Sequence, residues 1–249
     1  MLRIESAHKV FNKNTHDEFI ALKSLNLYVS DGEFVTIIGG NGAGKSTLFN
    51  IISGNILCDS GMIELGGIDI TYMPEYKRAS YIGRIFQDPM KGTAPNLTVG
   101  ENLIIAYMRS MKKNILSIPS NKEKNYIKER LADLKLGLEN RLNTKIGLLS
   151  GGQRQAIALV MATLIKPKLL LLDEHTAALD PVSAKAVMEL TEKIVTENNI
   201  TTLMITHNIK SALDYGGRTI MMDLGEIIID VCGEERKKLT VRELVSQYK

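Results

Sequence analysis

Residues 39–47 read Gly39-Gly40-Asn41-Gly42-Ala43-Gly44-Lys45-Ser46-Thr47 and contain the pattern G-x-x-x-x-G-K-[ST]. The pattern follows the apolar run Phe34–Ile38, which is typical of a buried strand, and precedes Leu48–Ile52, which can continue a helix. Glycines let a backbone wrap closely around an anion, and the N–H groups at a helix start attract it. The stretch therefore predicts a phosphate-binding loop for ATP or GTP, with Lys45 reaching the β- and γ-phosphates and the Ser46 hydroxyl holding Mg²⁺.

A second glycine pair occurs about a hundred residues later, in Leu149-Ser150-Gly151-Gly152-Gln153-Arg154-Gln155. Ser150 is a suitable N-cap for the apolar stretch that stops before Pro167, so the simplest interpretation is a loop followed by a capped helix. Two glycines at a helix start also expose N–H groups to an anion. The pattern leaves open whether this is an unrelated site or one that closes over a nucleotide held by another copy.

Two carboxylates end the leucine-rich segment Lys168-Leu169-Leu170-Leu171-Leu172-Asp173-Glu174. Four consecutive leucines are typical of a central strand buried on both faces, and α/β sheets carry their chemistry at the carboxyl ends of such strands. Asp173 is then placed to hold Mg²⁺ through water, and Glu174 to polarise the water that attacks the γ-phosphate. The alternative is a solvated acidic strand end without chemistry.

These motifs stand in a familiar order, and the chain resembles the nucleotide-binding subunit of an ATP-binding cassette (ABC) transporter over nearly its whole length. The resemblance implies an α/β fold, the P-loop NTPase of ABC type, with a mostly parallel core sheet, an antiparallel β lobe and an inserted helical subdomain. The segments that carry it are the phosphate loop, Gln87 within Ile85–Pro89, the signature Leu149–Gln155, the leucine-rich strand with Asp173 and Glu174, Ala178–Asp180, and His207 within Ile205–Asn208.

The resemblance also implies roles for individual residues. Phe11 occupies the place of the aromatic that stacks on adenine, although an ordinary edge-strand aromatic is the alternative. Gln87 would contact Mg²⁺ and the attacking water, and His207 would hydrogen-bond the γ-phosphate. His175 stands where many relatives have Pro and is assigned no chemistry. The expected catalytic residues are Glu174, His207, Gln87 and Lys45; the nucleotide-binding residues are Phe11, Gly39, Gly40, Asn41, Gly42, Ala43, Gly44, Lys45, Ser46, Thr47, Ser150, Gly151, Gly152 and Gln153; and the Mg²⁺ ligands are Ser46, Gln87 and Asp173.

Length and composition agree with a soluble nucleotide-binding domain. The chain has 249 residues, 44% hydrophobic and 24% charged, which is ordinary for a globular protein. A net charge of +3 without basic blocks gives no support for nucleic-acid binding. Cys58 and Cys232 have no metal or redox spacing, and no secretory signal or membrane-length apolar run is visible. We expect a cytoplasmic protein, peripheral on the cytoplasmic face of the cell membrane.

The expected organisation is one ABC ATPase domain over residues 1–249. Residues 1 to about 87 predict short strands and the phosphate loop, and with 166–249 they form the core and β lobe; residues about 88–165 form the helical signature subdomain. Helices are predicted from a capping box at Thr98–Glu101, over Lys122–Leu136, and after Ser150. Asp180-Pro181 predicts a fourth helix start, Asp223–Glu226 a turn between strands, and Thr240–Glu243 a final short helix.

The resemblance also implies partners. Two copies would bury two ATP molecules in a head-to-tail dimer, with Ser150, Gly151 and Gly152 of one copy serving the nucleotide of the other. A membrane permease would dock at residues 89–99, and an extracytoplasmic binding protein would act through the permease. The phrases Asp173–Pro181 and Gly39–Gly42 resemble importers linked to amino-acid-type solutes. An exporter ATPase and the iron–sulfur assembly type are the alternatives, and Gln153-Arg154-Gln155 favours the transporter class. Residues that choose the cargo would lie in the partner chains.

Overall fold

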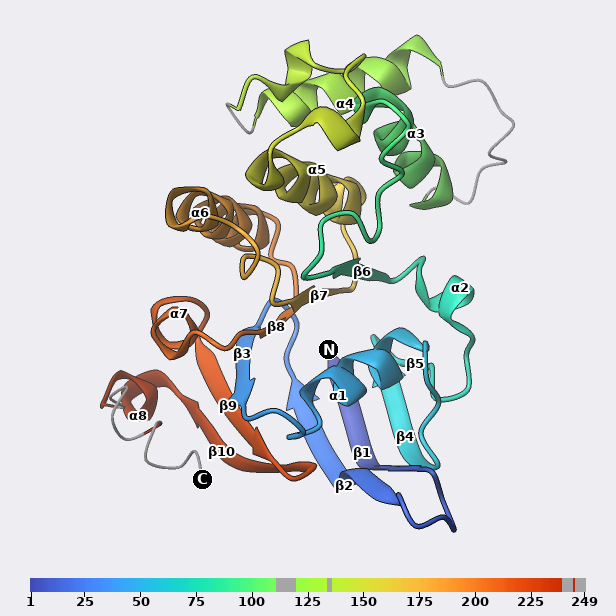
Figure 1. Ribbon diagram of the computed structural model, residues 1–249, viewed down its shortest axis with the longest axis vertical. Coiled ribbons are helices and arrows are strands. Elements are labelled where there is room, and N and C mark those ends of the chain that lie inside the picture. Colours follow the sequence, from blue (N-terminus) through green and yellow to red (C-terminus); the bar gives the residue numbers. More distant parts are fainter. Residues whose placement is uncertain (111–119, 134–135, 239–243, 245–249) are drawn as a thin grey trace.

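The structure is a computed structural model that describes residues 1–110, 120–133, 136–238 and 244. Strands occupy the part of the molecule opposite a group of helices (Figure 1). The strands are β1 Leu2–Phe11, β2 Phe19–Val29, β3 Phe34–Gly39, β4 Ser60–Leu65, β5 Ile68–Asp69, β6 Ile82–Ile85, β7 Leu169–Asp173, β8 Thr202–Ile205, β9 Arg218–Asp223 and β10 Glu226–Cys232. The helices are α1 Lys45–Ser53, α2 Glu75–Arg78, α3 Val99–Ser110, α4 Asn121–Ala132, α5 Gly151–Thr163, α6 Pro181–Glu197, α7 Ile209–Asp214, α8 Gly233–Lys238 and the 3-10 turns Leu138–Asn140 and Ile146–Leu148.

The larger sheet has six strands in the order β10-β9-β3-β8-β7-β6. Its strands pair in parallel except at the β9–β10 edge, which is antiparallel. The leucines of β7 are completely buried between β6 and β8, as a strand covered on both faces requires. The predicted turn at Asp223–Glu226 joins β9 and β10, with Leu224 and Gly225 both at positive φ. The expected mostly parallel core sheet is confirmed.

The smaller sheet is antiparallel, with the order β2-β1-β4-β5, and it is the expected β lobe. The expectation of short strands in this region is wrong for β1 and β2, which have 10 and 11 residues. Ser6 and Ser24 have positive φ, and the β1–β2 register shifts beside Ala7. Such bulges interrupt the two-residue alternation by which a long strand is recognised in a sequence.

The helices α3, α4 and α5 lie together at the end of the molecule away from the antiparallel sheet (Figure 1). They share an apolar cluster that includes Leu103 of α3, Ile127 of α4 and Ile157 of α5, all buried. The predicted capping box at Thr98 is present with its reciprocal hydrogen bonds. Ser150, predicted as an N-cap, also forms a capping box, with Gln153.

Two helix predictions have other outcomes. The helix predicted over Lys122–Leu136 ends at Ala132, and Leu136 is not helical. Gly137, with φ 68°, does not end α4. It is the left-handed N-cap residue of the 3-10 turn Leu138–Asn140. The helix predicted at Thr240–Glu243 lies outside the described residues.

A buried arginine fixes the far end of the helix that follows the phosphate loop. Arg78 has no exposed surface, and its guanidinium donates to the backbone carbonyls of Met73, Thr71, Ile51 and Ile52 at 2.6–3.0 Å. The last two carbonyls belong to the final turn of α1, where a cation also favours the helix dipole. Arg78 therefore satisfies otherwise unpaired carbonyls and anchors α1 to the segment before β6.

Candidate nucleotide-binding site

The phosphate loop leaves the carboxyl end of β3 and enters α1, as its sequence predicts. Gly44 is the N-cap of α1 and has φ 97°. A Cβ on Gly44 would lie 2.5 Å from the carbonyl oxygen of Ala21, so both its conformation and its surroundings require glycine. The loop is thus held against β2 while its N–H groups surround the start of a helix, an arrangement that attracts anions.

Lys45 is held in place by the loop that precedes it. Its ammonium donates to the carbonyl oxygens of Gly39 at 2.7 Å and Gly40 at 2.8 Å, and the residue is only 6% exposed. Burial lowers the pKa of Lys45, whereas the nearby carboxylates of Glu174 and Asp173 raise it. An ammonium has three N–H groups, so one remains for a ligand in the loop.

A pocket of about 230 Å³ brings the loop together with two of the expected catalytic residues. Asn41, Gly42, Ala43, Gly44, Lys45, Ser46, Thr47, Glu174, His207 and Phe19 line it. Glu174 Oε1 lies 2.6 Å from His207 Nε2, and the side chains are 15% and 49% exposed. Residues more than 120 positions apart in the sequence therefore meet at one site beside the phosphate loop.

Glu174 reaches this pocket through an unusual backbone conformation. Its φ is 47°, in the left-handed region that costs a non-glycine residue about 1 kcal/mol or more. Its N–H donates to the carbonyl of Ile205 at 3.0 Å, and its own carbonyl accepts from Ala177 at 2.9 Å. These bonds hold the turn after β7, so the Glu174 side chain points to His207 and not along the strand.

Asp173 is an expected metal ligand that ends β7, and its carboxylate contacts an arginine. Arg84 Nη2 donates to Asp173 Oδ2 at 3.2 Å, and the Asp173 side chain is 19% exposed. Within the described ranges, no group of three or more His, Cys, Asp or Glu side chains could form a metal site. One carboxylate, the Ser46 hydroxyl and phosphate oxygens are nevertheless the donor set that suits Mg²⁺.

Gln87 and Phe11, like Asp173, Gly39 and Gly40, are not among the residues that line this pocket. Gln87 follows β6 and is exposed. Phe11 ends β1, which is flanked by β2 and β4 and is therefore not an edge strand. Phe19 of β2 pairs directly with Phe11 across the sheet and does line the pocket. Directly paired residues share a face of the sheet, so Phe11 and Phe19 lie on the same face.

Sequence reasoning missed Phe19, although a signal for it existed. Residues 12–18 are polar and separate the two phenylalanines, which is the pattern of a hairpin loop that would place Phe11 opposite Phe19. The Asp173–Arg84 contact had no comparable signal, because its partners are 89 positions apart.

The signature residues lie apart from the phosphate-loop pocket. Ser150 caps α5 by accepting from the Gln153 N–H, and Gln153 returns a hydrogen bond to the Ser150 N–H at 3.2 Å. Ser150, Gly152 and Gln153 line a separate pocket of about 420 Å³ between α5 and α6. A Cβ on Gly152 would lie 3.0 Å from Ser183 of α6, so the helices approach closely there. The signature therefore does not contribute to the pocket that contains Lys45 of the same chain.

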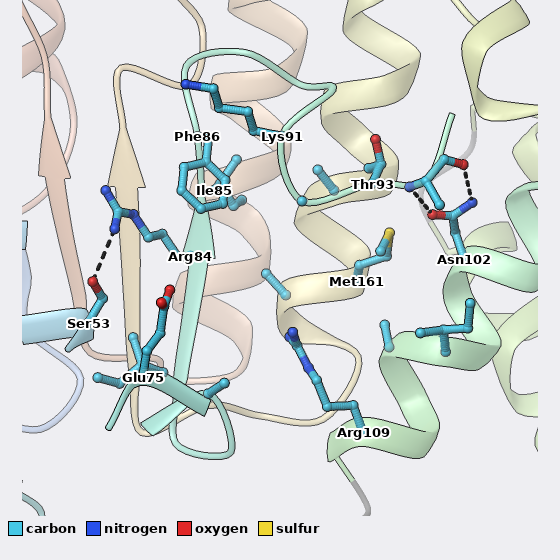
Figure 2. Close-up of a pocket in the computed structure, with 18 residues that line it drawn as sticks. Ser53, Glu75, Arg84, Ile85, Phe86, Lys91, Thr93, Asn102, Arg109 and Met161 are labelled. Carbon is cyan, nitrogen blue, oxygen red and sulfur yellow. Dashed lines mark hydrogen bonds between the residues drawn. The ribbon is translucent and has the colours of Figure 1, made fainter. Parts of the chain in front are cut away.

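Another hollow, of about 390 Å³, lies between the end of β6 and helices α3 and α5 (Figure 2). Its floor is apolar, with Ile85, Phe86 and Met161 among its residues. The charged side chains of Glu75, Lys91 and Arg109 also line it. We call it the inter-lobe pocket.

Comparisons with known proteins identify the family of this chain. Residues 22–177 match the family model described as ABC transporter. The chain is 47% identical over 248 residues to a tyrosine transport ATP-binding protein of Clostridioides difficile (strain R20291), covering 100% of this chain and 98% of the relative. It is 33% identical over 251 residues to a phosphonates import ATP-binding protein of Lactococcus lactis subsp. cremoris (strain SK11), covering 98% of each chain.

A solved structure also matches the fold. It shows the ATP-binding cassette MJ0796 as a dimer in a post-hydrolysis state, bound to ADP and Pi. The TM-score is 0.78 with 30% identity, over 93% of this chain and 98% of the other.

The chain belongs to the ABC transporter family. Within that family it is an ATP-binding protein and an ATPase. In the described part of the chain, no helix combines the length and apolar character needed to cross a membrane.

Proposed function

We propose that this chain is the ATP-hydrolysing subunit of a bacterial importer for a small solute such as an amino acid. The observation that carries the proposal is the joining of the phosphate loop, Glu174 and His207 in one pocket. The 47% identity to a tyrosine transport ATP-binding protein over the whole chain supports an amino-acid-type solute. In this proposal residues 1–249 form one ABC ATPase domain that lies on the cytoplasmic face of the membrane.

Hydrolysis follows from the positions of the side chains. Lys45 binds the β- and γ-phosphates with the N–H that its two carbonyl contacts leave available. Glu174 accepts a proton from the attacking water, and His207 donates to the γ-phosphate. Phe11 provides a surface for the adenine, extended by Phe19. Mg²⁺, held by Ser46, Asp173 and Gln87, would neutralise charge on the phosphates.

The Glu174–His207 contact connects the base with the phosphate-sensing residue. At 2.6 Å the two side chains share a hydrogen bond, so a phosphate that draws His207 toward itself also changes the environment of Glu174. We infer that this pair helps to make hydrolysis depend on a correctly placed γ-phosphate.

A second copy completes the site in this proposal. Ser150, Gly151 and Gly152 lie at the positive start of α5 and outside the lining of their own phosphate-loop pocket, so in this proposal they serve a nucleotide on another chain. The dimeric cassette with ADP and Pi has the same fold and supports this arrangement. A two-fold dimer would then bury two nucleotides, and ATP would drive its closure.

The inter-lobe pocket is the proposed docking place for the permease. Its apolar floor lies beside residues 89–99. Among the described residues, Glu75, Lys91 and Arg109 form no ion pair. An apolar helix with a few charged groups would be complementary to such a surface. An extracytoplasmic binding protein would deliver the solute to that permease.

The decisive experiment for the active site is Glu174→Gln, which keeps shape but removes the base. We expect ATP binding to be retained and turnover to fall by about 10²-fold or more. Glu192→Gln, an exposed carboxylate on α6, is the matched control and should not change turnover. Turnover of Glu174→Gln within about threefold of wild type would contradict the general-base role. Co-purification with a polytopic membrane protein tests the transporter class separately.

A further inference from the structure

Arg84 of β6 connects three elements around the proposed metal site. Its Nη2 donates to Asp173 Oδ2 at 3.2 Å, and its Nη1 donates to Ser53 Oγ at 3.0 Å at the end of α1. Its guanidinium carbon lies 4.7 Å from the centroid of the Phe86 ring. Figure 2 shows Arg84 between Ser53 and Phe86 at the edge of the inter-lobe pocket.

These contacts hold Arg84 without using its full capacity. The side chain is only 12% exposed, yet within the described residues its Nε is buried and has no hydrogen-bond partner. A guanidinium has five N–H donors, and the Asp173 contact is single and long for a charge-assisted bond. A small movement of Arg84 would therefore break few interactions, and the Phe86 ring could stabilise the cation in a second position.

Phe86 extends the connection to the signature helix. Its carbonyl accepts a hydrogen bond from Gln155 Nε2 at 3.3 Å, and Gln155 is a completely buried residue of α5. Its ring lines the inter-lobe pocket, and the next residue is Gln87. Asp173, Arg84, Phe86 and Gln155 thus form one continuous series of contacts from the sheet end to α5.

We propose that Arg84 is a positioning residue that competes with the divalent cation for Asp173. When the cation replaces Arg84 at Asp173, the movement of the Arg84 side chain is transmitted to Phe86 and the inter-lobe pocket. The inference rests on the proposed metal site. A cation at Asp173 and the Arg84 guanidinium carry like charge and need the same carboxylate. Cation binding therefore weakens the Arg84–Asp173 contact and moves the guanidinium relative to the Phe86 ring, whose environment changes as a result.

Direct metal binding tests the competition. Mn²⁺ is titrated into a sample that contains ADP and an excess of the full chain. The free ion is measured by electron paramagnetic resonance. Arg84→Met removes the competing charge and should tighten Mn²⁺ binding by about three- to tenfold, the scale of a partly buried ion pair. Arg84→Lys keeps the charge and should stay near wild type. Arg3→Met, an exposed arginine of β1, is the matched control and should have no effect.

Fluorine resonance tests the transmission. The chain has five phenylalanines, so fluorophenylalanine gives few signals and Phe86→Leu assigns the one of interest. With ADP bound, adding Mg²⁺ should shift the Phe86 resonance in wild type and leave it nearly unchanged in Arg84→Met. A residue that only supported the fold would lower the melting temperature without altering this response.

The outcomes separate the inference from the function on which it rests. Asp173→Asn should weaken Mn²⁺ binding, and Arg84→Met added to it should have no further effect. The Arg84 proposal is wrong, and the metal site stands, if Asp173→Asn weakens Mn²⁺ binding while Arg84→Met binds Mn²⁺ as tightly as wild type. The same conclusion follows if Asp173→Asn weakens Mn²⁺ binding but Mg²⁺ does not shift the Phe86 resonance. If Asp173→Asn leaves Mn²⁺ binding unchanged, the proposed metal site and this inference both fail.

Discussion

Lowering the pH from about 7.5 to about 5 should destabilise the fold through one buried side chain, His175. The ring is 2% exposed, and its Nε2 lies 3.2 Å from Thr191 Oγ1 on α6. The single Thr191 hydroxyl proton is donated to the Val187 carbonyl at 2.8 Å, so the hydroxyl can only accept from His175. The neutral imidazole with hydrogen on Nε2 therefore satisfies this hydrogen bond, and burial away from water disfavours the charged ring.

The size of the effect follows from the pKa. Burial lowers the pKa of His175 from 6.5 to about 4. Above pH 6.5 both folded and unfolded chains are neutral at this ring, so it makes no contribution to the pH dependence. Below pH 6.5 the unfolded chain binds the proton and the folded chain does not, so the free energy of unfolding falls with pH. The loss is about 2 kcal/mol at pH 5 and about 3 kcal/mol by pH 4, at 1.36 kcal/mol per pH unit.

Urea unfolding followed by circular dichroism at several pH values between about 7.5 and 5 measures this loss. This window lies above the range in which carboxylates with lowered pKa, such as Asp59, lose their contribution. His175→Gln can still donate to Thr191 and should remove most of the decline, whereas His16→Gln, at an exposed position, should retain it. A wild-type free energy that changes by less than about 0.5 kcal/mol, or an equal decline in His175→Gln, would refute the reasoning.

Three further predictions concern other parts of the chain. Phe11→Ala should weaken ATP binding in calorimetry by about 1–3 kcal/mol, with a smaller loss for Phe19→Ala; GTP should also bind, because stacking does not read base edges, and an unchanged affinity would make Phe11 a packing residue. In a Glu174→Gln background, Gly151→Asp should abolish ATP-driven dimerisation in light scattering while the monomer still binds ATP, and the uncharged Gly151→Asn should retain more dimer; a persistent Gly151→Asp dimer would contradict the shared site. Arg78→Met leaves buried carbonyls unpaired and should lower the free energy of unfolding by about 3 kcal/mol or more, and a loss below about 1 kcal/mol in urea unfolding would show that the carbonyls find other partners.

Local features of this fold could be predicted from the sequence because neighbouring residues determine them. The phosphate loop, the caps at Thr98, Ser150 and Asp180, and the turn before Glu226 each depend on residues within a few positions. The leucine-rich strand was recognisable because its burial on both faces produces an unbroken apolar run.

The missed features depend on distant contacts or on broken periodicity. Arg78 has the appearance of a surface residue in the sequence, but it is buried because the α1 carbonyls that it binds lie 26 and 27 positions earlier. Arg84 meets Asp173 only because β6 and β7 pair in parallel. The length of β1 was underestimated because the positive φ of Ser6 interrupts the alternation. The roles assigned to Gln87 and the signature residues stay predictions.

The two carbonyl contacts of Lys45 also bear on the thermodynamics of nucleotide exchange. A free lysine side chain has about 2 kcal/mol of rotamer entropy to lose when it is immobilised. Here Gly39 and Gly40 already hold the ammonium, so that entropy is lost when the protein folds and not when a nucleotide arrives. The same carbonyls keep the ammonium satisfied after phosphate departs. The loop can therefore bind and release nucleotide repeatedly with little change in its own order, which suits an enzyme that must turn over.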